Sequence, residues 1–356
     1  VSYIVFALIG IFGSAPFFAS QTSIPEVREY GTTYLTICCV AGIGIFMQTT
    51  FERLLQSTGR TIYAMITQGA GAIINLILDP VLIFGLLGFP KLGVAGAAIA
   101  TVAGQMVAAV LAVIFNLKVN KEIRISFKGF RPNGALIGSI YKVGVPSIVM
   151  QAIGSVMTYG MNLILEAFGA AQTVFGIYFK LQSFIFMPVF GLNNGMVPII
   201  AYNYGAGSRE RVVKTMKSSV RYAVGIMLVG LLIMELFPGT LIGFFNATDE
   251  LLVIGVPALR TICLSFCFAG YCIVVGSVFQ ALGNGVYSMI VSIARQLCVL
   301  LPVAYLLSLS GNVNLIWWAF PIAELVSVGM TTFFLKRINR NIISHIGETL
   351  QETEMD

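Results

Sequence analysis

Charged side chains are scarce in this sequence. They make up 10% of its 356 residues, whereas soluble domains typically carry about 25%. Hydrophobic residues account for 57%, and the mean hydropathy is +0.90. Because so few charges cannot cover the surface of a soluble globule, the composition excludes a soluble domain. The net charge of +6 therefore bears on membrane topology rather than on nucleic-acid binding.

Catalytic and nucleotide-binding patterns are also lacking. The chain has a single histidine, His345, and carries no GxxxxGK[ST], HExxH or GxSxG pattern. Its six cysteines fall in apolar stretches without metal-site spacing, so we interpret them as small hydrophobic side chains. We therefore expect no enzyme, no cofactor, no metal site and no ATP hydrolysis.

The sequence does contain long apolar blocks. Each has roughly the 20 residues that a helix needs to cross a hydrocarbon core of about 30 Å. The sequence therefore predicts an all-α polytopic membrane protein. We expect ten spans, at residues 1–19, 31–52, 62–87, 93–116, 140–168, 173–201, 220–245, 253–280, 286–309 and 313–335.

Basic residues gather in three segments, at 118–131, 209–221 and 336–340. With ten spans, all three segments lie on one side of the membrane, together with Arg53 and Arg60. Lysine and arginine near the ends of spans favour the cytoplasmic side. We therefore expect a multi-pass protein of the plasma membrane, with its basic loops and both chain ends in the cytoplasm.

A shift of 224 residues brings two parts of the sequence into register, so that 56–66 falls on 280–290. Six predicted spans separate the two copies. An even number of spans gives both copies the same orientation, which indicates a parallel repeat related by an axis along the membrane normal. The matched residues are Gln56, Gly59, Tyr63, Met65 and Ile66 with Gln280, Gly283, Tyr287, Met289 and Ile290, and upstream Glu26 and Gly31 with Glu250 and Gly255.

A parallel repeat predicts two lobes of six spans each. The chain opens on Val1, already inside an apolar block and without an initiator methionine, so we expect the first two of twelve spans to be missing. The polar stretch "LKVNKEIRISFKGFRPNG" is the expected joint between the lobes. The expected organisation is the remainder of an N-terminal lobe with four spans at 1–117, a cytoplasmic linker at 118–138, a C-terminal lobe with six spans at 139–337 and a cytoplasmic polar tail at 338–356.

One acid, Asp79, lies deep inside an apolar block. An ionised side chain at mid-helix costs about 2.5–3.5 kcal/mol on insertion scales, so such acids usually face a cavity or a partner. Asn75 lies four residues earlier on the same helix face, and Pro80 releases the carbonyl of Leu76. These oxygens suit a hard cation, and equally a proton, because burial favours a neutral carboxyl group. The alternative is an Asp-Pro bend whose carboxylate reaches the outer interface.

Several motifs keep a definite order and spacing along the chain: "RLLQSTGRT", "INLILDPVLIFG" followed by "LGVAGAAIATVAGQ", "VGVPSIVMQ", and "PVFGLNNGMVPIIAYNYGAG". Together they resemble the multidrug and toxic compound extrusion (MATE) transporters over essentially the whole chain. The resemblance implies two six-helix bundles that face a central cleft. It also implies export of amphipathic, often cationic compounds in exchange for protons or sodium ions.

The resemblance also implies a cation site in the first lobe. In this family an Asn-xxx-Asp pattern on one span, a threonine on the next and an aspartate on the first span form the site. Asn75 and Asp79 match the pattern directly, and Thr101 in "GAAIATVAG" is the natural match for the threonine. The first-span aspartate belongs to a span that we expect to be missing. The stretches 144–159 and 251–280, where some members carry second-lobe acids, contain none here, which favours coupling in the first lobe.

Further polar side chains within the spans are candidates for lining a substrate cleft. Helix–helix hydrogen bonds explain such residues equally well, and Lys180 could instead snorkel along its helix. Arg295 and Glu324 are expected to pair with each other or to cap helix ends, which is a structural role. The cleft candidates are Gln48, Gln151, Tyr159, Asn162, Lys180, Asn193 and Asn194.

We therefore predict a secondary active exporter that works by alternating access and exchanges its cargo for H⁺ or Na⁺. Its expected partners are small amphipathic molecules and the lipid bilayer, with no nucleic acid and no obligatory protein partner. A flippase for lipid-linked saccharides is the first alternative, for which more cationic residues should line the cleft. A membrane-embedded enzyme is the second, and the missing acid pair, histidine cluster and nucleophile motif argue against it.

Overall fold

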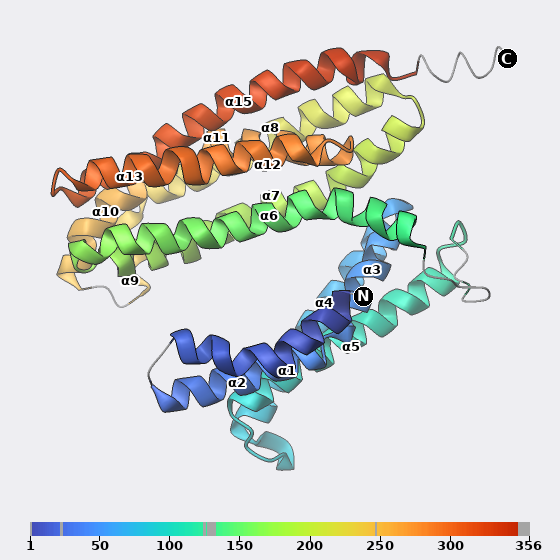
Figure 1. Ribbon diagram of the computed structural model, residues 1–356, viewed down its shortest axis with the longest axis horizontal. Coiled ribbons are helices and arrows are strands. Elements are labelled where there is room, and N and C mark those ends of the chain that lie inside the picture. Colours follow the sequence, from blue (N-terminus) through green and yellow to red (C-terminus); the bar gives the residue numbers. More distant parts are fainter. Residues whose placement is uncertain (1, 22–23, 124–125, 127–132, 246–247, 348–356) are drawn as a thin grey trace. The chain divides into compact units, whose positions relative to one another are not determined.

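The computed structural model describes residues 2–21, 24–123, 126, 133–245 and 248–347, which fold into helices joined by short turns (Figure 1). Among these described residues, eight helices are long and apolar enough to cross a membrane, and the number rises to ten when each of two bent pairs is taken as one span. The predicted all-α polytopic fold is therefore confirmed. Parts of the predicted linker and of the predicted tail lie outside the described residues, as does Val1.

Contacts within the chain divide it into two compact units, Val1–Phe130 and Arg131–Asp356, here called unit 1 and unit 2. In unit 1, α1 lies beside α2, and α5 lies beside α2, α3 and α4. The helices α2 and α3 are the halves of one bent element and meet at 47°. The elements of unit 1 are α1 (Ser2–Gln21), α2 (Pro25–Val40), α3 (Ile43–Ser57), α4 (Thr61–Phe84), η1 (Leu86–Gly88) and α5 (Val94–Lys118).

Unit 2 surrounds a large apolar core that includes the fully buried rings of Phe175, Phe266, Phe279 and Trp317. Its bent pair, α10 and α11, meets at 48°, and α15 lies beside α11 and the π-helical segment η3. The elements of unit 2 are α6 (Gly134–Leu165), η2 (Glu166–Phe168), α7 (Ala171–Gly205), α8 (Arg209–Leu236), α9 (Pro238–Gly243), α10 (Asp249–Cys263), α11 (Phe266–Ala281), α12 (Gly285–Ile293), η3 (Ala294–Leu300), α13 (Leu301–Ser308), α14 (Val313–Ile316), α15 (Ala319–Asn341) and η4 (Ile343–His345).

The predicted internal repeat is confirmed by the helix boundaries. The pair α2 and α3 spans 25–57, and a shift of 224 residues places it on 249–281, which are the outer bounds of α10 and α11. The next span is Thr61–Phe84 in one copy and Gly285–Ser308 in the other, with 24 residues in each. The two copies therefore share their backbone plan, including a bend at nearly the same position.

Each copy turns between these spans at an equivalent glycine. Gly59 has a φ of +75° and Gly283 a φ of +77°. A side chain is disfavoured in this left-handed region, whereas glycine adopts it without strain. The positive φ required at this turn thus explains why both matched motifs carry a glycine there.

Candidate functional site

The three residues of the predicted cation site meet between α4 and α5 of unit 1. On α4, Asn75 Nδ2 donates a hydrogen bond to Asp79 Oδ1 at 3.2 Å. The same nitrogen donates to Thr101 Oγ1 on α5 at 3.5 Å. Thr101 Oγ1 itself donates to the carbonyl of Ala97 at 2.9 Å. Because its proton is used there, Thr101 presents oxygen lone pairs to the site.

Glycines allow α4 and α5 to approach closely enough for this contact. A Cβ atom placed on Gly71 would lie 2.9 Å from the Gly104 carbonyl oxygen, and one placed on Gly104 would lie 2.6 Å from the Gly71 carbonyl oxygen. Asn75 follows Gly71 by one helical turn, and its Cβ would lie 3.2 Å from a Cβ on Gly104. Backbone contacts of this kind are typical of small-residue helix interfaces in membranes. They bring Asn75 within reach of Thr101.

Backbone and side-chain oxygens together make up the ligand set of the site. Pro80 lies inside α4, and because proline has no N–H, the carbonyl of Leu76 lacks its helical donor. Asn75, Asp79 and Thr101 are half-buried. Asp79 supplies the one formal negative charge of the group. Such a set suits a proton or a single hard cation.

A monovalent ion matches this group better than a divalent one. Among the residues that the structure describes, no cluster of three or more His, Cys, Asp or Glu side chains is placed to hold a metal ion. Calcium sites in proteins take about six to eight oxygen ligands, which is more than Asn75, Asp79, Thr101 and one freed carbonyl supply.

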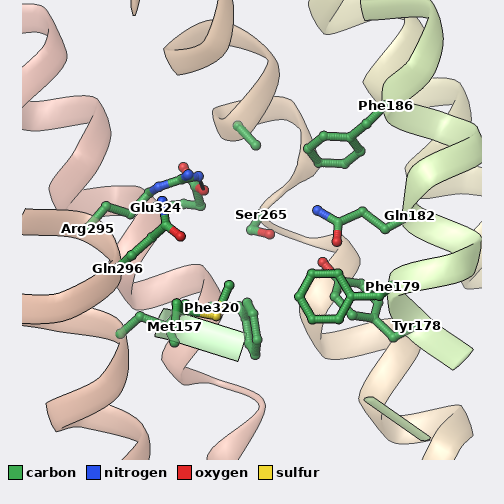
Figure 2. Close-up of a pocket in the computed structure, with 12 residues that line it drawn as sticks. Met157, Tyr178, Phe179, Gln182, Phe186, Ser265, Arg295, Gln296, Phe320 and Glu324 are labelled. Carbon is green, nitrogen blue, oxygen red and sulfur yellow. Dashed lines mark hydrogen bonds and ion pairs between the residues drawn. The ribbon is translucent and has the colours of Figure 1, made fainter. Parts of the chain in front are cut away.

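A second polar site lies inside unit 2. Arg295 of η3 donates from Nη1 to Glu324 Oε1 of α15, and the pair lines a cavity of about 80 Å³. Figure 2 shows the pair and Gln296 across the cavity from Gln182, with Ser265 between them. The cavity is lined by Met157, Tyr178, Phe179, Gln182, Phe186, Ser265, Ala269, Arg295, Gln296, Leu300, Phe320 and Glu324.

The charges in this cavity balance each other. Glu324 is only 7% exposed, and the guanidinium of Arg295 neutralises its carboxylate. Within the described part of the chain, Glu324 Oε2 and Gln182 Oε1 are buried without a protein hydrogen-bond partner. The cavity has room for a few water molecules that can donate to these oxygens. Sites for drug-sized ligands measure about 300–1,000 Å³, so this cavity is too small for one.

The predicted cleft residues are spread over three helices. Gln48 lies on α3 of unit 1, where its Nε2 donates to Glu52 Oε1 at 3.0 Å. Gln151 and Tyr159 are exposed on α6, and Asn162 is half-buried there. The cavity of unit 2 is lined by other residues. A role of these four side chains in substrate binding stays a prediction.

The remaining three cleft candidates lie on α7. Lys180 is exposed, and its Nζ lies 5.6 Å from the ring centroid of Phe245. This cation–π contact agrees with the snorkelling interpretation of the lysine. Asn193 is 8% exposed, and its Oδ1 is buried without a partner among the described residues, while Asn194 is exposed. These positions also remain predictions as substrate ligands.

Sequence reasoning did not single out Gln182, Gln296 or Tyr178, which line the cavity of unit 2. They come from α7 and η3, and only packing between these distant segments brings them together. A signal was present, because Gln182 and Gln296 are amides within apolar spans, as Gln151 is. The pairing expected of Arg295 with Glu324 is observed.

Comparison with known proteins places this geometry in context. The MatE family model matches residues 1–81 and 146–306. The multidrug export protein MepA of Staphylococcus haemolyticus is 27% identical over 318 residues, which cover 89% of this chain and 69% of the relative. MepA of Staphylococcus saprophyticus is 28% identical over 302 residues, which cover 85% of this chain and 66% of the relative.

Solved structures show the same fold. A structure of the MATE multidrug transporter DinF-BH is 30% identical, with a TM-score of 0.85, and the match covers 96% of this chain and 76% of that one. The chain spans about two thirds of the length of the curated relatives it matches. The likeness thus extends over nearly all of the chain, but over only part of each relative.

Proposed function

This chain belongs to the MatE family, whose relatives named above are multidrug exporters, and on that premise we propose that it exports small organic molecules across a membrane. We expect its substrates to be amphipathic and often cationic. Their uphill export is driven by exchange for H⁺ or Na⁺. The proposed protein is a transporter and not an enzyme.

The contact of Asn75 with both Asp79 and Thr101 carries the proposal. It gathers one acid and several neutral oxygens between two spans, at a point where the helices touch through glycine. A proton or Na⁺ that binds there neutralises Asp79. Neutralisation changes the hydrogen bond that Asn75 donates to the carboxylate, and hence the fit of α4 against α5.

Coupling requires that ion and substrate prefer different conformations of the protein. We propose that ion binding at Asp79 favours a conformation of unit 1 that holds the substrate weakly and opens outward. By thermodynamic linkage, bound substrate then weakens ion binding to the same degree. This reciprocity couples substrate release to ion binding, and it needs no covalent intermediate.

The proposed orientation follows from charge. The basic segments 209–221 and 336–340 and the residues Arg53 and Arg60 are assigned to the cytoplasm by the positive-inside rule. The chain ends lie on the same side, and the protein is a multi-pass component of the plasma membrane. Export then runs from the cytoplasm outward.

Ethidium efflux from cells that express the protein tests the proposal, with proton and sodium gradients imposed separately. Asp79→Asn keeps the size and polarity of the side chain but removes its charge, and we expect it to abolish gradient-driven efflux. The matched control is Glu166→Gln, which neutralises an exposed acid in η2 and is expected to export normally. An Asp79→Asn protein that exports ethidium at full rate against a gradient overturns the proposed coupling site.

A further inference from the structure

A buried acid that the proposed coupling site does not use lies on α3 of unit 1. Glu52 is 5% exposed, and polar atoms of three side chains lie within hydrogen-bond distance of its carboxyl group. Gln48 Nε2 and Thr67 Oγ1 reach Oε1 at 3.0 Å and 2.8 Å, and Gln68 Nε2 reaches Oε2 at 2.8 Å. All three partners are neutral groups.

A count of hydrogens shows which protonation state this arrangement fits. Thr67 Oγ1 lies 2.8 Å from Glu52 Oε1 and 2.7 Å from the carbonyl oxygen of Ala64. A hydroxyl group has only one proton to donate. If Glu52 is ionised, one of these two short oxygen–oxygen contacts lacks a hydrogen. If Glu52 carries a proton on Oε1, it donates to Thr67, Thr67 donates to Ala64, and every contact is satisfied.

The described contacts of Glu52 include no positively charged side chain. The two ion pairs among the described residues are Arg260–Glu235 and Arg295–Glu324, so Glu52 belongs to neither. Other charged and titratable groups lie on the elements packed around Glu52, at the same end of unit 1 as Glu52 itself. They are Arg53 of α3, Arg60 and Tyr63 at the start of α4, Lys118 at the end of α5 and Tyr3 of α1.

From this geometry we propose that Glu52 binds a proton and forms a second proton site in unit 1. On release, the carboxylic acid passes its proton to water, which gives a carboxylate and a hydronium ion. The Thr67 hydroxyl then turns from the Ala64 carbonyl to Oε1, so that the carboxylate gains a third donor beside Gln48 and Gln68. Both protonation states are therefore accommodated by the rotation of one hydroxyl group.

The site shares a helix face with the proposed coupling site. Thr67, Gly71, Asn75 and Asp79 follow one another at intervals of four residues on α4, so they lie along one face. Thr67 and Asp79 are about 18 Å apart along the helix axis. The role of Glu52 in transport rests on the proposed function, but the presence of its proton does not.

Infrared spectroscopy of the purified protein tests the proposal directly. We expect the wild-type protein at neutral pH to show a carbonyl stretching band of a protonated carboxyl group, and Glu52→Gln to lose it. Exchange into D₂O should shift the band, because the proton exchanges with water. The matched control is Glu122→Gln, which alters an exposed acid and should keep the band. A spectrum that Glu52→Gln leaves unchanged overturns the proposal, as does a band that D₂O leaves in place.

A second variant covers the case in which Glu52→Gln does not fold. Thr67→Val keeps the acid but removes the acceptor of its proton, so the band should move to the position of a more weakly bonded carboxyl group. A band at the wild-type position in Thr67→Val contradicts the proposed bond.

Efflux assays separate the proposed proton site from the proposed transport function. Wild-type protein that shows the band but exports no dye rejects the transport function and keeps the proton site.

Discussion

The two copies of the internal repeat carry different polar groups on the same pair of spans. In unit 1 these spans are α4 and α5. In unit 2 the shift of 224 residues places them on the segment Gly285–Ser308 and on α15. Arg295 falls on Gly71, and Glu324 falls on Ala100, the neighbour of Thr101. Each unit thus has a polar group on the same helix pair, although Arg295 falls one helical turn from the level of Asn75 and two turns from that of Asp79.

The difference lies in charge and in backbone. The unit 1 site holds one net negative charge on a continuous helix, with glycine at the contact. The unit 2 site is neutral overall, and its helix widens into the π-helical segment Ala294–Leu300 around Arg295. A site with uncompensated charge can bind and release an ion, whereas a self-neutralised pair has little affinity left for one. One backbone plan can therefore serve for coupling in one unit and for cohesion in the other.

The largest effect is expected from breaking the unit 2 pair. Arg295→Met leaves Glu324 buried without compensation, and removal of one partner from such a pair costs about 3–5 kcal/mol. The double variant Arg295→Met/Glu324→Gln removes both charges and should recover most of this loss. The free energy of unfolding in detergent, measured for the single variants, the double variant and wild type, checks this. Equal losses in the single and double variants would show that the pair is not cohesive.

An intermediate effect is expected at the glycine contact of unit 1. In Gly71→Ala the new Cβ would lie 2.9 Å from the Gly104 carbonyl oxygen and 3.0 Å from Ala108 Cβ. Overpacking of this kind costs about 1–3 kcal/mol. Gly69→Ala is the matched control on the same helix, since no atom lies within 4 Å of its new Cβ, and alanine is the better helix former by about 1 kcal/mol. Thermal unfolding should rank Gly71→Ala well below Gly69→Ala, and equal stabilities would contradict the close contact.

The smallest effect is expected at Thr101. Its contact with Asn75 is long, at 3.5 Å, and loss of one hydrogen bond costs about 0.5–1.5 kcal/mol. Thr101→Val should therefore raise the ion concentration needed for half-maximal efflux by up to about tenfold. Thr101→Ser keeps the hydroxyl and should resemble wild type. If serine proves as poor as valine, the hydroxyl oxygen is not a ligand.

Much of the fold could be predicted from the sequence because local rules govern it. Span length follows from the thickness of the bilayer. The glycines at positions 59 and 283 indicate the repeat, because both turns require a positive φ. The contact of Asn75 with Asp79 follows from a spacing of four residues on one helix. The match of Thr101 depended on family resemblance, since no local rule connects it with α4.

What escaped prediction depends on packing between distant segments. The helices bend at 41–42 and at 264–265, and neither break contains a proline. Without that signal, the sequence predicts one uninterrupted span at 31–52 and another at 253–280. Gln182 and Gln296 become neighbours only when α7 and η3 pack around one cavity. Glu52 lies at the end of its predicted span, where an acid can reach the membrane interface and so does not indicate a functional site. Its spacing of four from Gln48 was the available signal.

The two bends match in angle but not in sequence. The residues at the two breaks differ, Ala41 and Gly42 in one copy and Leu264 and Ser265 in the other, yet the angles agree at 47° and 48°. If the copies arose by duplication of an ancestral gene, the bend has outlasted the amino acids that first made it. Distant relatives of this chain should then be more readily recognised by the position of that bend than by any residue conserved around it.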